Sequence, residues 1–423
     1  MYKLIIFTVM VFNLGYDLLM RGLAARQKKL PLPDNVRDIY DEADYSRWRE
    51  YSAERSRAEL ISTIADFVLG LFLFGTNVFS EVYGVLPGGE YVRSILLMVM
   101  YGAFLTLWSI PYEYIVTMKI EGKYGFNKTS GKTFVTDLIT NFLVNTAVNV
   151  ALMCFAMFMF DKMGAAFFAV LFAVIAVFML AVNMLSMTFM RLFNKFTPLP
   201  DGSLRDRLVT MFRGAGYELS DIRVMDASRR TTKVNAFCTG LGKFKKIALY
   251  DNLVENYTED EIAAVFAHEL AHFKHRDTAK MTAYNLLTMA ALTAMIAAFA
   301  LIPQISLDYG FADVNFAFAL AALTGVLLSP VMTVLQIPAA FFGRRYEYRA
   351  DRMAAELGYG DAMVSVLKKL ARDNFSDLSP HPAIVALEHN HPTVSARIER
   401  ILTKYYGLMV KDYGLILYLS ADG

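Results

Sequence analysis

The chain has 423 residues, of which 56% are hydrophobic and 19% are charged. Because soluble domains usually have about 45–50% apolar and about 25% charged residues, this composition indicates a membrane protein and excludes an ordinary soluble one. A formal net charge of +2 leaves no excess of basic residues for a polyanion, so we expect no nucleic-acid partner. The two cysteines, Cys154 and Cys238, lie in an apolar run and a polar segment, and they predict no disulfide framework.

Seven segments are long and apolar enough to cross a bilayer, since a spanning helix needs about 20 mostly apolar residues. In chain order they are 4–20, 60–82, 94–117, 137–160, 164–190, 279–304 and 314–341. The first, within MYKLIIFTVMVFNLGYDLLM, could also be a signal peptide with a cleavage site near Ala24 and Ala25. We favour an uncleaved first span, because many apolar segments follow it and no separate export signal is needed.

Basic residues in the loops predict the side of the membrane on which each loop lies, since lysine and arginine stay in the cytoplasm. The segment 21–58 carries nine lysines and arginines, and the loop 118–136 carries four. By contrast, 83–93 has only Arg93, and 305–313 has no basic residue. This asymmetry predicts an N-terminus outside and a C-terminus in the cytoplasm.

The spans divide the chain into four regions. An N-terminal membrane region, 1–190, holds five spans and their loops. Two polar regions, 191–278 and 342–423, follow on the cytoplasmic side, and only the hairpin of the last two spans, 279–341, separates them. Because that hairpin leaves the cytoplasm and returns to it, the two polar regions can form one catalytic domain at the membrane face.

The stretch VFAHELAHFKHRDT places His268, Glu269 and His272 in the order H-E-x-x-H. Its surroundings, EDEIAAVFAHELAHFKH, predict a helix with Asp260 and Glu261 in the first turn, where the macrodipole favours acids. Residues four apart share a helix face, so both imidazoles can bind one ion while the glutamate activates a water molecule. Zinc is the expected ion, because it binds imidazole nitrogens and, in catalytic sites, keeps one coordination position open for water. The alternative is a pair of surface histidines on an amphipathic helix.

A catalytic zinc site needs a third protein ligand. His275 lies on the same helix face but a turn farther along, and Asp277 is similarly remote. The stretch GRRYEYRADRMAAELG, after the last span, predicts a helix with Glu347 and Asp351 on one face. Glu347 could bind the metal while Asp351 accepts the far N–H of a ligand histidine. Glu356 is the next choice, and the alternative is an arginine-rich surface helix with ion pairs such as that of Glu347 with Arg344.

Polar and apolar residues alternate in the segments TKVNAFCTG and KIALYD, which are joined through GLGKFK. This pattern predicts a β-hairpin. An exposed edge of this hairpin could hold an extended peptide by strand addition. The alternative is an ordinary structural hairpin.

These motifs together resemble the M48 metallopeptidases, in particular the CAAX prenyl proteases of the Ste24 type. The resemblance rests on the zinc motif and, in the same order, on residues 120–139, 192–204, 234–254, 344–354 and 391–398. It covers nearly the whole chain. It implies a mainly α, polytopic fold in which about seven helices ring a large chamber in the bilayer. A cytoplasmic α+β protease domain of the zincin type would hold one zinc ion.

The resemblance also implies roles for individual residues. Glu347 would be the third zinc ligand, and Asp351 would orient a ligand histidine. Asn235 and Ala236 would hold the substrate backbone at a strand edge. His391 would stabilise the oxyanion, for which a donor is chemically required. Arg397 is a further candidate in the same region, as a substrate-binding residue, and for both residues a capping or surface role is the alternative.

The predicted activity is that of an integral-membrane zinc endopeptidase that cleaves after a prenylated cysteine and releases a C-terminal tripeptide. One alternative is a quality-control metalloprotease of membrane proteins with no prenyl requirement. Another is a zinc-binding transporter or channel, which the spans disfavour because few charges lie deep within them. The expected partners are a peptide or protein substrate and membrane lipid. The compact polar insert suits a bacterial member in the inner membrane, or the endoplasmic reticulum membrane in a eukaryote.

Overall fold

The computed structural model of the chain describes residues 1–127, 129–228, 236–239 and 244–405. Its contacts divide the chain into two compact units, each assembled from three separated segments. The first unit comprises Met1–Ala25, Ala43–Ala176 and Leu286–Leu335, and the second comprises Arg26–Glu42, Val177–Asn285 and the chain from Gln336 onward.

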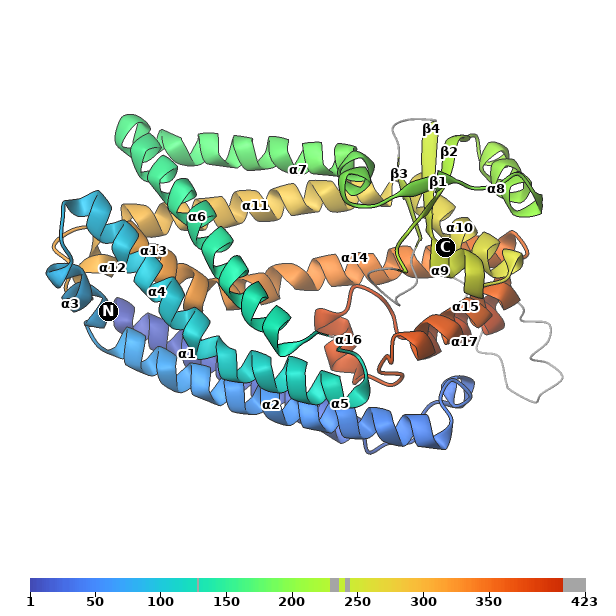
Figure 1. The fold of residues 1–423 in the computed structure, drawn as a ribbon, viewed down its shortest axis with the longest axis horizontal. Coiled ribbons are helices and arrows are strands. Elements are labelled where there is room, and N and C mark those ends of the chain that lie inside the picture. Colours follow the sequence, from blue (N-terminus) through green and yellow to red (C-terminus); the bar gives the residue numbers. More distant parts are fainter. Residues whose placement is uncertain (128, 229–235, 240–243, 406–423) are drawn as a thin grey trace. The chain divides into compact units, whose positions relative to one another are not determined.

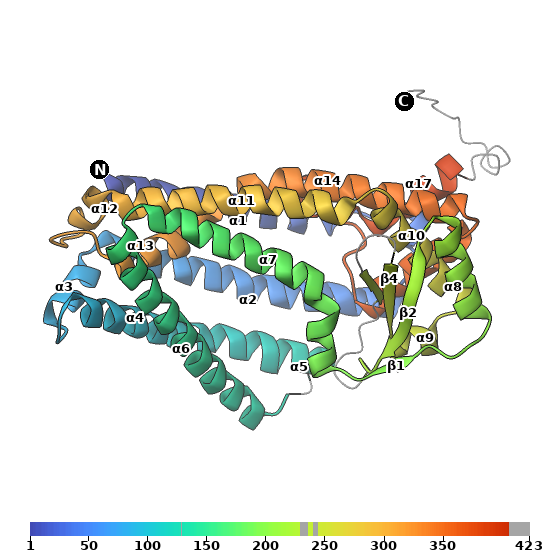
Figure 2. The ribbon, with the colours of Figure 1, turned by 90° about the horizontal axis from the view of Figure 1, so that it is seen from above.

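The first unit consists of helices (Figure 1). They are α1 (Tyr2–Gln27), α2 (Glu42–Gly75), α3 (Val78–Val85), α4 (Glu90–Glu113), α5 (Gly122–Tyr124), α6 (Gly131–Met163), α12 (Pro303–Leu307) and α13 (Phe316–Ala322), with π-helical turns at Tyr114–Glu121 and Leu323–Leu327. Three further helices, α7 (Ala166–Phe193), α11 (Asp277–Leu301) and α14 (Leu328–Glu356), contribute residues to both units. Helix α4 packs against α6 and α13 (Figure 2).

The predicted spans are all helical in the structure. Among the described residues, six helices have the length and composition to cross a membrane, and the remaining predicted span, 164–190, is apolar over the shorter stretch Ala166–Val182. The polytopic membrane fold is therefore confirmed, whereas the ring of helices and its chamber stay a prediction. Two boundaries were wrong. The second predicted span, 60–82, breaks where α2 ends at Gly75, and the last continues without interruption to Glu356.

The core of the first unit includes side chains of the first helix. Ile6 and Met10 of α1 are 1% and 6% exposed and belong to the same buried cluster as Phe79 and Phe318. The rings of Phe79 and Phe318 meet edge to face, with their centroids 5.4 Å apart. Since α1 supplies part of this core, its packing favours an uncleaved first span over a removable signal peptide.

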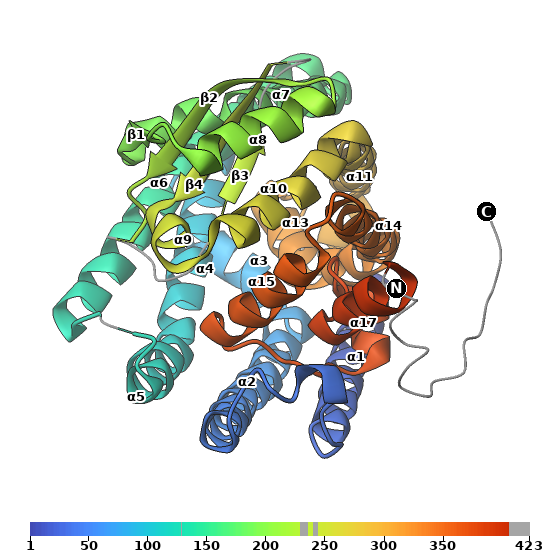
Figure 3. The same cartoon turned by 90° about the vertical axis from the view of Figure 1, so that its right-hand side faces the viewer.

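The second unit combines a small sheet with short helices (Figure 3). Its strands are β1 (Phe196–Pro198), β2 (Glu218–Met225), β3 (Ala236–Thr239) and β4 (Phe244–Tyr250), in the order β1-β2-β4-β3. Its helices are α8 (Ser203–Gly214), α9 (Asp251–Asn256), α10 (Glu259–Lys274), α15 (Gly360–Asp373), α16 (Pro382–Glu388) and α17 (Val394–Tyr405), with a 3-10 turn at Asp34–Val36. The strands β2 and β4 are parallel, and the other neighbours are antiparallel.

The predicted β-hairpin is confirmed, because β3 pairs antiparallel with β4, with Ala236 opposite Leu249 and Thr239 opposite Lys246. Among the described strands, β3 has a neighbour on one side only. The sheet faces helices through a core that includes Phe212 of α8 and Phe266 of α10, both of which are fully buried. This packing fixes α10 beside the edge strand.

Residues 26–42, which lie within the predicted N-terminal region 1–190, belong to the second unit by their contacts. The Tyr40 hydroxyl donates to the carbonyls of Ala371 and Ser376, at 3.0 Å each. Asn35 Nδ2 donates to the carbonyl of Ser395 at 2.8 Å. These contacts span more than 300 residues of sequence, so no local pattern in the segment could have indicated them.

Candidate metal centre

The helix that carries the H-E-x-x-H motif is fixed at its start by a capping box. The Thr258 hydroxyl accepts a hydrogen bond from the backbone N–H of Glu261 at 3.3 Å, and the Glu261 carboxylate accepts one from the backbone N–H of Thr258 at 2.9 Å. Glu261 also binds Ser365 and Lys369 of α15, at 2.6 and 2.7 Å. The predicted helix with acids in its first turn is therefore confirmed, and α15 holds it in place.

The structure brings the three expected metal ligands together. His268 and His272 lie on α10, and Glu347 lies on α14. The two Nε2 atoms are 3.3 Å apart, and each is 3.6 Å from an oxygen of Glu347. A tetrahedral ion with bonds of about 2.0–2.1 Å needs donor atoms about 3.3–3.4 Å apart, so this donor set fits zinc both in geometry and in chemistry.

Each ligand histidine has its other ring nitrogen on a carboxylate. Nδ1 of His268 donates to Asp351 at 3.0 Å, and Nδ1 of His272 donates to Asp277 at 3.1 Å. These bonds leave both Nε2 atoms free to face a cation and fix the ring orientations. Sequence reasoning weighed Asp277 only as a ligand and missed this role. Its position five residues after His272, at the start of α11, was the available signal.

The electrostatic environment of His268 favours a positive charge at the ring. Burial is the largest effect and lowers the pKa of His268, but the hydrogen bond to Asp351 and the negative charges of Asp351 and Glu347 together raise the pKa overall. The Asp351 carboxylate therefore stabilises positive charge on the imidazole, which is the same effect that it would exert on a cation bound at Nε2.

Two arginines pair with Asp351 and Asp277, the carboxylates that contact the ligand histidines. Arg397 contacts Asp351 at 2.6 and 2.7 Å and Glu347 at 3.3 Å, and its side chain is only 12% exposed. Arg349 is ion-paired with Asp277. From the sequence, Arg397 was predicted to bind substrate, and no role was predicted for Arg349. The observed contacts place both guanidinium groups on the carboxylates, where they fix the ligand cluster.

Glu269 and His391 line the cavity beside the donor set. Glu269 is partly buried and lines the cavity beside His268, and no described residue hydrogen-bonds to its carboxylate. His391 is 61% exposed, and its Nδ1 lies 3.1 Å from Glu347. A free carboxylate and an accessible imidazole therefore lie next to the position that a metal would occupy.

The loop that carries His391 is fixed against α14. Arg344 donates to the carbonyls of Val385 and His389 at 2.6 Å, so it caps the C-terminus of α16 rather than pairing with Glu347. At Gly343, a Cβ atom would lie 2.7 Å from the carbonyl oxygen of Asn390, so only glycine permits this close approach.

A cavity of about 200 Å³ opens beside the donor set. One wall carries His268, Glu269, Glu347, His391 and Arg397, and the other is apolar, formed by Ala236, Leu253, Val265, Met363, Val366, Leu367 and Leu370. Ala236 brings the edge strand β3 to this cavity, whereas Asn235 lies outside the described residues. The arrangement suits an apolar side chain next to a reacting carbonyl group.

The other residues weighed as metal ligands do not join the cluster. His275 ends α10 as its C-cap, and Glu356 pairs with Arg352 at 2.7 Å. Within the part of the chain that the structure describes, His268, His272 and Glu347 are the one group of three metal-binding side chains found.

Comparisons with known proteins find matches to family models, to individual proteins and to a solved structure. Residues 198–404 match the model of peptidase family M48, and residues 23–195 match the model of the CAAX prenyl protease N-terminal region with five membrane helices. CAAX prenyl protease 1 of Saccharomyces cerevisiae is 27% identical over 407 residues, covering 87% of each chain. The human CAAX prenyl protease 1 homolog is 25% identical and covers 95% of this chain and 96% of its own. The crystal structure of S. mikatae Ste24p superposes with a TM-score of 0.77 at 26% identity, over 95% of this chain and 98% of that one.

Proposed function

Because this chain belongs to peptidase family M48, as a membrane metallopeptidase of the CAAX prenyl protease type, we propose that it uses zinc to hydrolyse proteins in which a C-terminal tripeptide follows a prenylated cysteine. Cleavage after that cysteine would release a C-terminal tripeptide. The observation that carries the zinc assignment is the spacing of three donor atoms, two of them oriented by carboxylates, beside the free carboxylate of Glu269.

His268, His272 and Glu347 would hold the ion. When bound, zinc supplies Lewis-acid activation of a water molecule and of the scissile carbonyl. Asp351 and Asp277 keep both histidines in the tautomer that presents Nε2 to the ion.

Glu269 moves the protons of the reaction. Its carboxylate takes a proton from the attacking water and delivers that proton to the nitrogen of the leaving amine. This role needs a carboxylate that is not already engaged, and the absence of a hydrogen bond from any described residue to Glu269 supports it. His391, accessible at the cavity mouth, would donate a hydrogen bond to the oxyanion.

The substrate backbone would lie along the edge of β3. The strand has a partner on one side only among the described strands, and an extended peptide could pair with its other side. Asn235 and Ala236 would hold that peptide, and the apolar wall with Val366 and Leu367 would accept a substrate side chain.

The basic loops support an orientation with the N-terminus outside and the catalytic unit in the cytoplasm. Such a site would meet protein termini that are anchored to the cytoplasmic leaflet by a lipid.

Matched farnesylated and unmodified peptides test the substrate proposal. The purified chain should cleave the farnesylated peptide after its cysteine, should cleave the unmodified one much more slowly, and should lose both activities with a chelator. Mass spectrometry of the products identifies the bond that is cut. Equal cleavage of both peptides would instead support a general protease of membrane proteins and would overturn the prenyl requirement.

Replacing Asp277 by asparagine should weaken zinc binding by about 10–100-fold, because a partner that orients a ligand histidine contributes about that much. Competition with a metal indicator dye measures the change. Asp206→Asn, an exposed carboxylate on α8, is the matched control and should bind zinc as the unmodified chain does. Unchanged affinity in Asp277→Asn would rule out the orienting role.

A further inference from the structure

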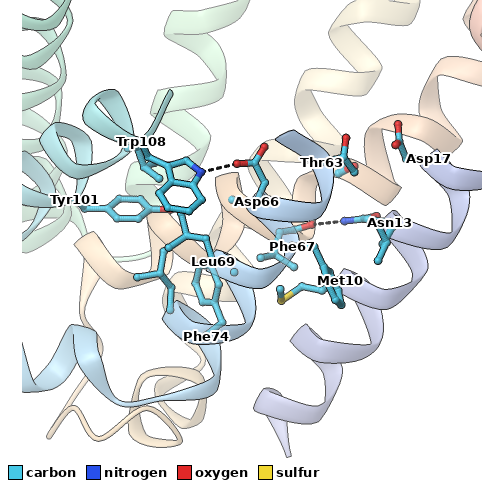
Figure 4. Close-up of a pocket in the computed structure, with 17 residues that line it drawn as sticks. Met10, Asn13, Asp17, Thr63, Asp66, Phe67, Leu69, Phe74, Tyr101 and Trp108 are labelled. Atoms are coloured by element: carbon cyan, nitrogen blue, oxygen red, sulfur yellow. Dashed lines mark hydrogen bonds between the residues drawn. The ribbon is translucent and has the colours of Figure 1, made fainter. Parts of the chain in front are cut away.

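The first unit contains a second cavity, of about 490 Å³, among helices that are apolar enough to cross a membrane (Figure 4). Its walls come from α1, α2, α4, the π-helical turn Leu323–Leu327 and the first turn of α14. Its size lies within the range of about 300–1,000 Å³ that is usual for pockets that take small organic ligands.

Polar and apolar side chains divide this cavity. Figure 4 shows Asp66, Thr63 and Asp17 gathered along one side, with Met10 and Phe74 on the other. The polar side includes two carboxylates, and no lysine, arginine or histidine is among the described residues that line the cavity.

The two carboxylates differ in their partners. Asp17 forms an ion pair with Arg21 at 2.6 Å, and Arg21 in turn reaches Glu59 at 3.1 Å. Asp66 instead accepts hydrogen bonds from neutral donors, the indole N–H of Trp108 at 2.7 Å and the hydroxyl of Ser62 at 3.2 Å. The negative charge of Asp66 therefore has no cationic partner within the described chain.

Asp66 is exposed in the structure, and its place in the sequence is unusual for a charged side chain. It lies nine residues before α2 ends at Gly75, about 14 Å along the helix, within a candidate membrane span. Charged side chains within membrane spans generally face the interior of the helix bundle or a water-filled cavity, and they generally mark a binding site or a transport path.

The surrounding backbone leaves room for a ligand. A Cβ atom at Gly325 would lie 3.3 Å from the hydroxyl of Tyr101, so glycine at this position keeps the cavity open. Gly325 lies in the π-helical turn Leu323–Leu327, and Asn13 of α1 donates to the carbonyl of Val326 at 3.3 Å. Turns of this kind are frequent at functional sites.

We propose that this cavity binds an organic cation with an apolar body, such as an amine that carries an aromatic or aliphatic group. The ammonium group pairs with the Asp66 carboxylate. The side chains of Trp108 and Phe67 line the same cavity as Asp66, and Met10, Leu73 and Phe74 contact the apolar body. This site is separate from the metal centre, and its occupation does not require the metal.

Dansylcadaverine, a fluorescent primary amine with an aromatic group, is a suitable probe, and its N-acetyl derivative is the neutral control. The full chain in nanodiscs of zwitterionic phosphatidylcholine is titrated with each compound, in the presence of chelator. We expect saturable binding of the amine, with affinity at least about tenfold higher than that of the acetylated compound, because charge-assisted hydrogen bonds contribute about that much.

Asp66→Asn should lower the affinity for the amine by about 10–100-fold and should leave the acetylated compound unaffected. Asp137→Asn, an exposed carboxylate on α6 outside the cavity, is the matched control and should retain binding. Thermal unfolding of each variant reports whether it is folded. Wild-type affinity in Asp66→Asn would overturn the proposal. If that variant does not fold, the proposal is tested by comparing the affinities of the amine and the acetylated compound for the unmodified chain. Equal affinity for the two compounds would reject the proposed cation site.

Discussion

Replacing Glu269 by glutamine should lower peptide hydrolysis by about 10²–10⁴-fold and leave one zinc ion per chain. The amide keeps the size of the side chain but cannot take a proton from water, and proton transfer by a positioned side chain contributes about this factor to the rate. The metal stays because its ligands, His268, His272 and Glu347, are unchanged. Turnover of a farnesylated peptide and metal content by mass spectrometry are measured on the same preparation.

Glu218→Gln is the matched control for this prediction, since Glu218 is an exposed acid on β2 of the same unit. That variant should cleave peptide at the rate of the unmodified chain. If Glu269→Gln also retained full turnover, the proton would have to move through another group. If it lost its zinc as well, Glu269 would be part of the metal site rather than the base.

Replacing Glu347 by alanine should remove both the metal and the activity. A zinc site with two remaining protein ligands lacks the three that catalytic sites use, so the affinity loss should exceed the about 10–100-fold of an orienting residue. The contacts of Arg397 with Asp351 remain, so the fold around the site is expected to persist. Metal content after dialysis and peptide turnover are the two measurements.

A zinc add-back experiment separates this effect from unfolding. The unmodified chain, stripped with a chelator, should recover its activity when one equivalent of zinc is returned. The Glu347→Ala variant should not recover at that ratio, although its thermal unfolding remains cooperative. Recovery of the variant with one equivalent of zinc would show that Glu347 is not a ligand.

The parts of the site that the sequence predicted are those set by helix periodicity. His268 and His272, four residues apart, share a face of α10, and Glu347 and Asp351 share a face of α14. The spans could be read in the same way, because a run of apolar residues must form a helix in a bilayer. The β-hairpin was predicted from the alternation of polar and apolar residues on either side of two glycines.

The parts that the sequence did not predict depend on contacts between distant segments. The pairing of Asp277 with Arg349 joins residues 72 positions apart, and Arg397 reaches back 46 positions to Asp351. The sequence analysis predicted no role for Asp66, because its pairing with Trp108 and its place in a cavity appear only after α2 and α4 are brought together. A charged residue in the sequence does not reveal which residue it will contact or whether it will line a cavity.

Anomalous diffraction at the zinc edge, from crystals of the chain purified without added metal, tests the central claim most directly. We predict one strong peak per chain, about 2.0–2.1 Å from Nε2 of His268, Nε2 of His272 and an oxygen of Glu347. A peak bound by other residues, or a fully ordered Glu347 directed away from an ion held by the two histidines, would contradict it.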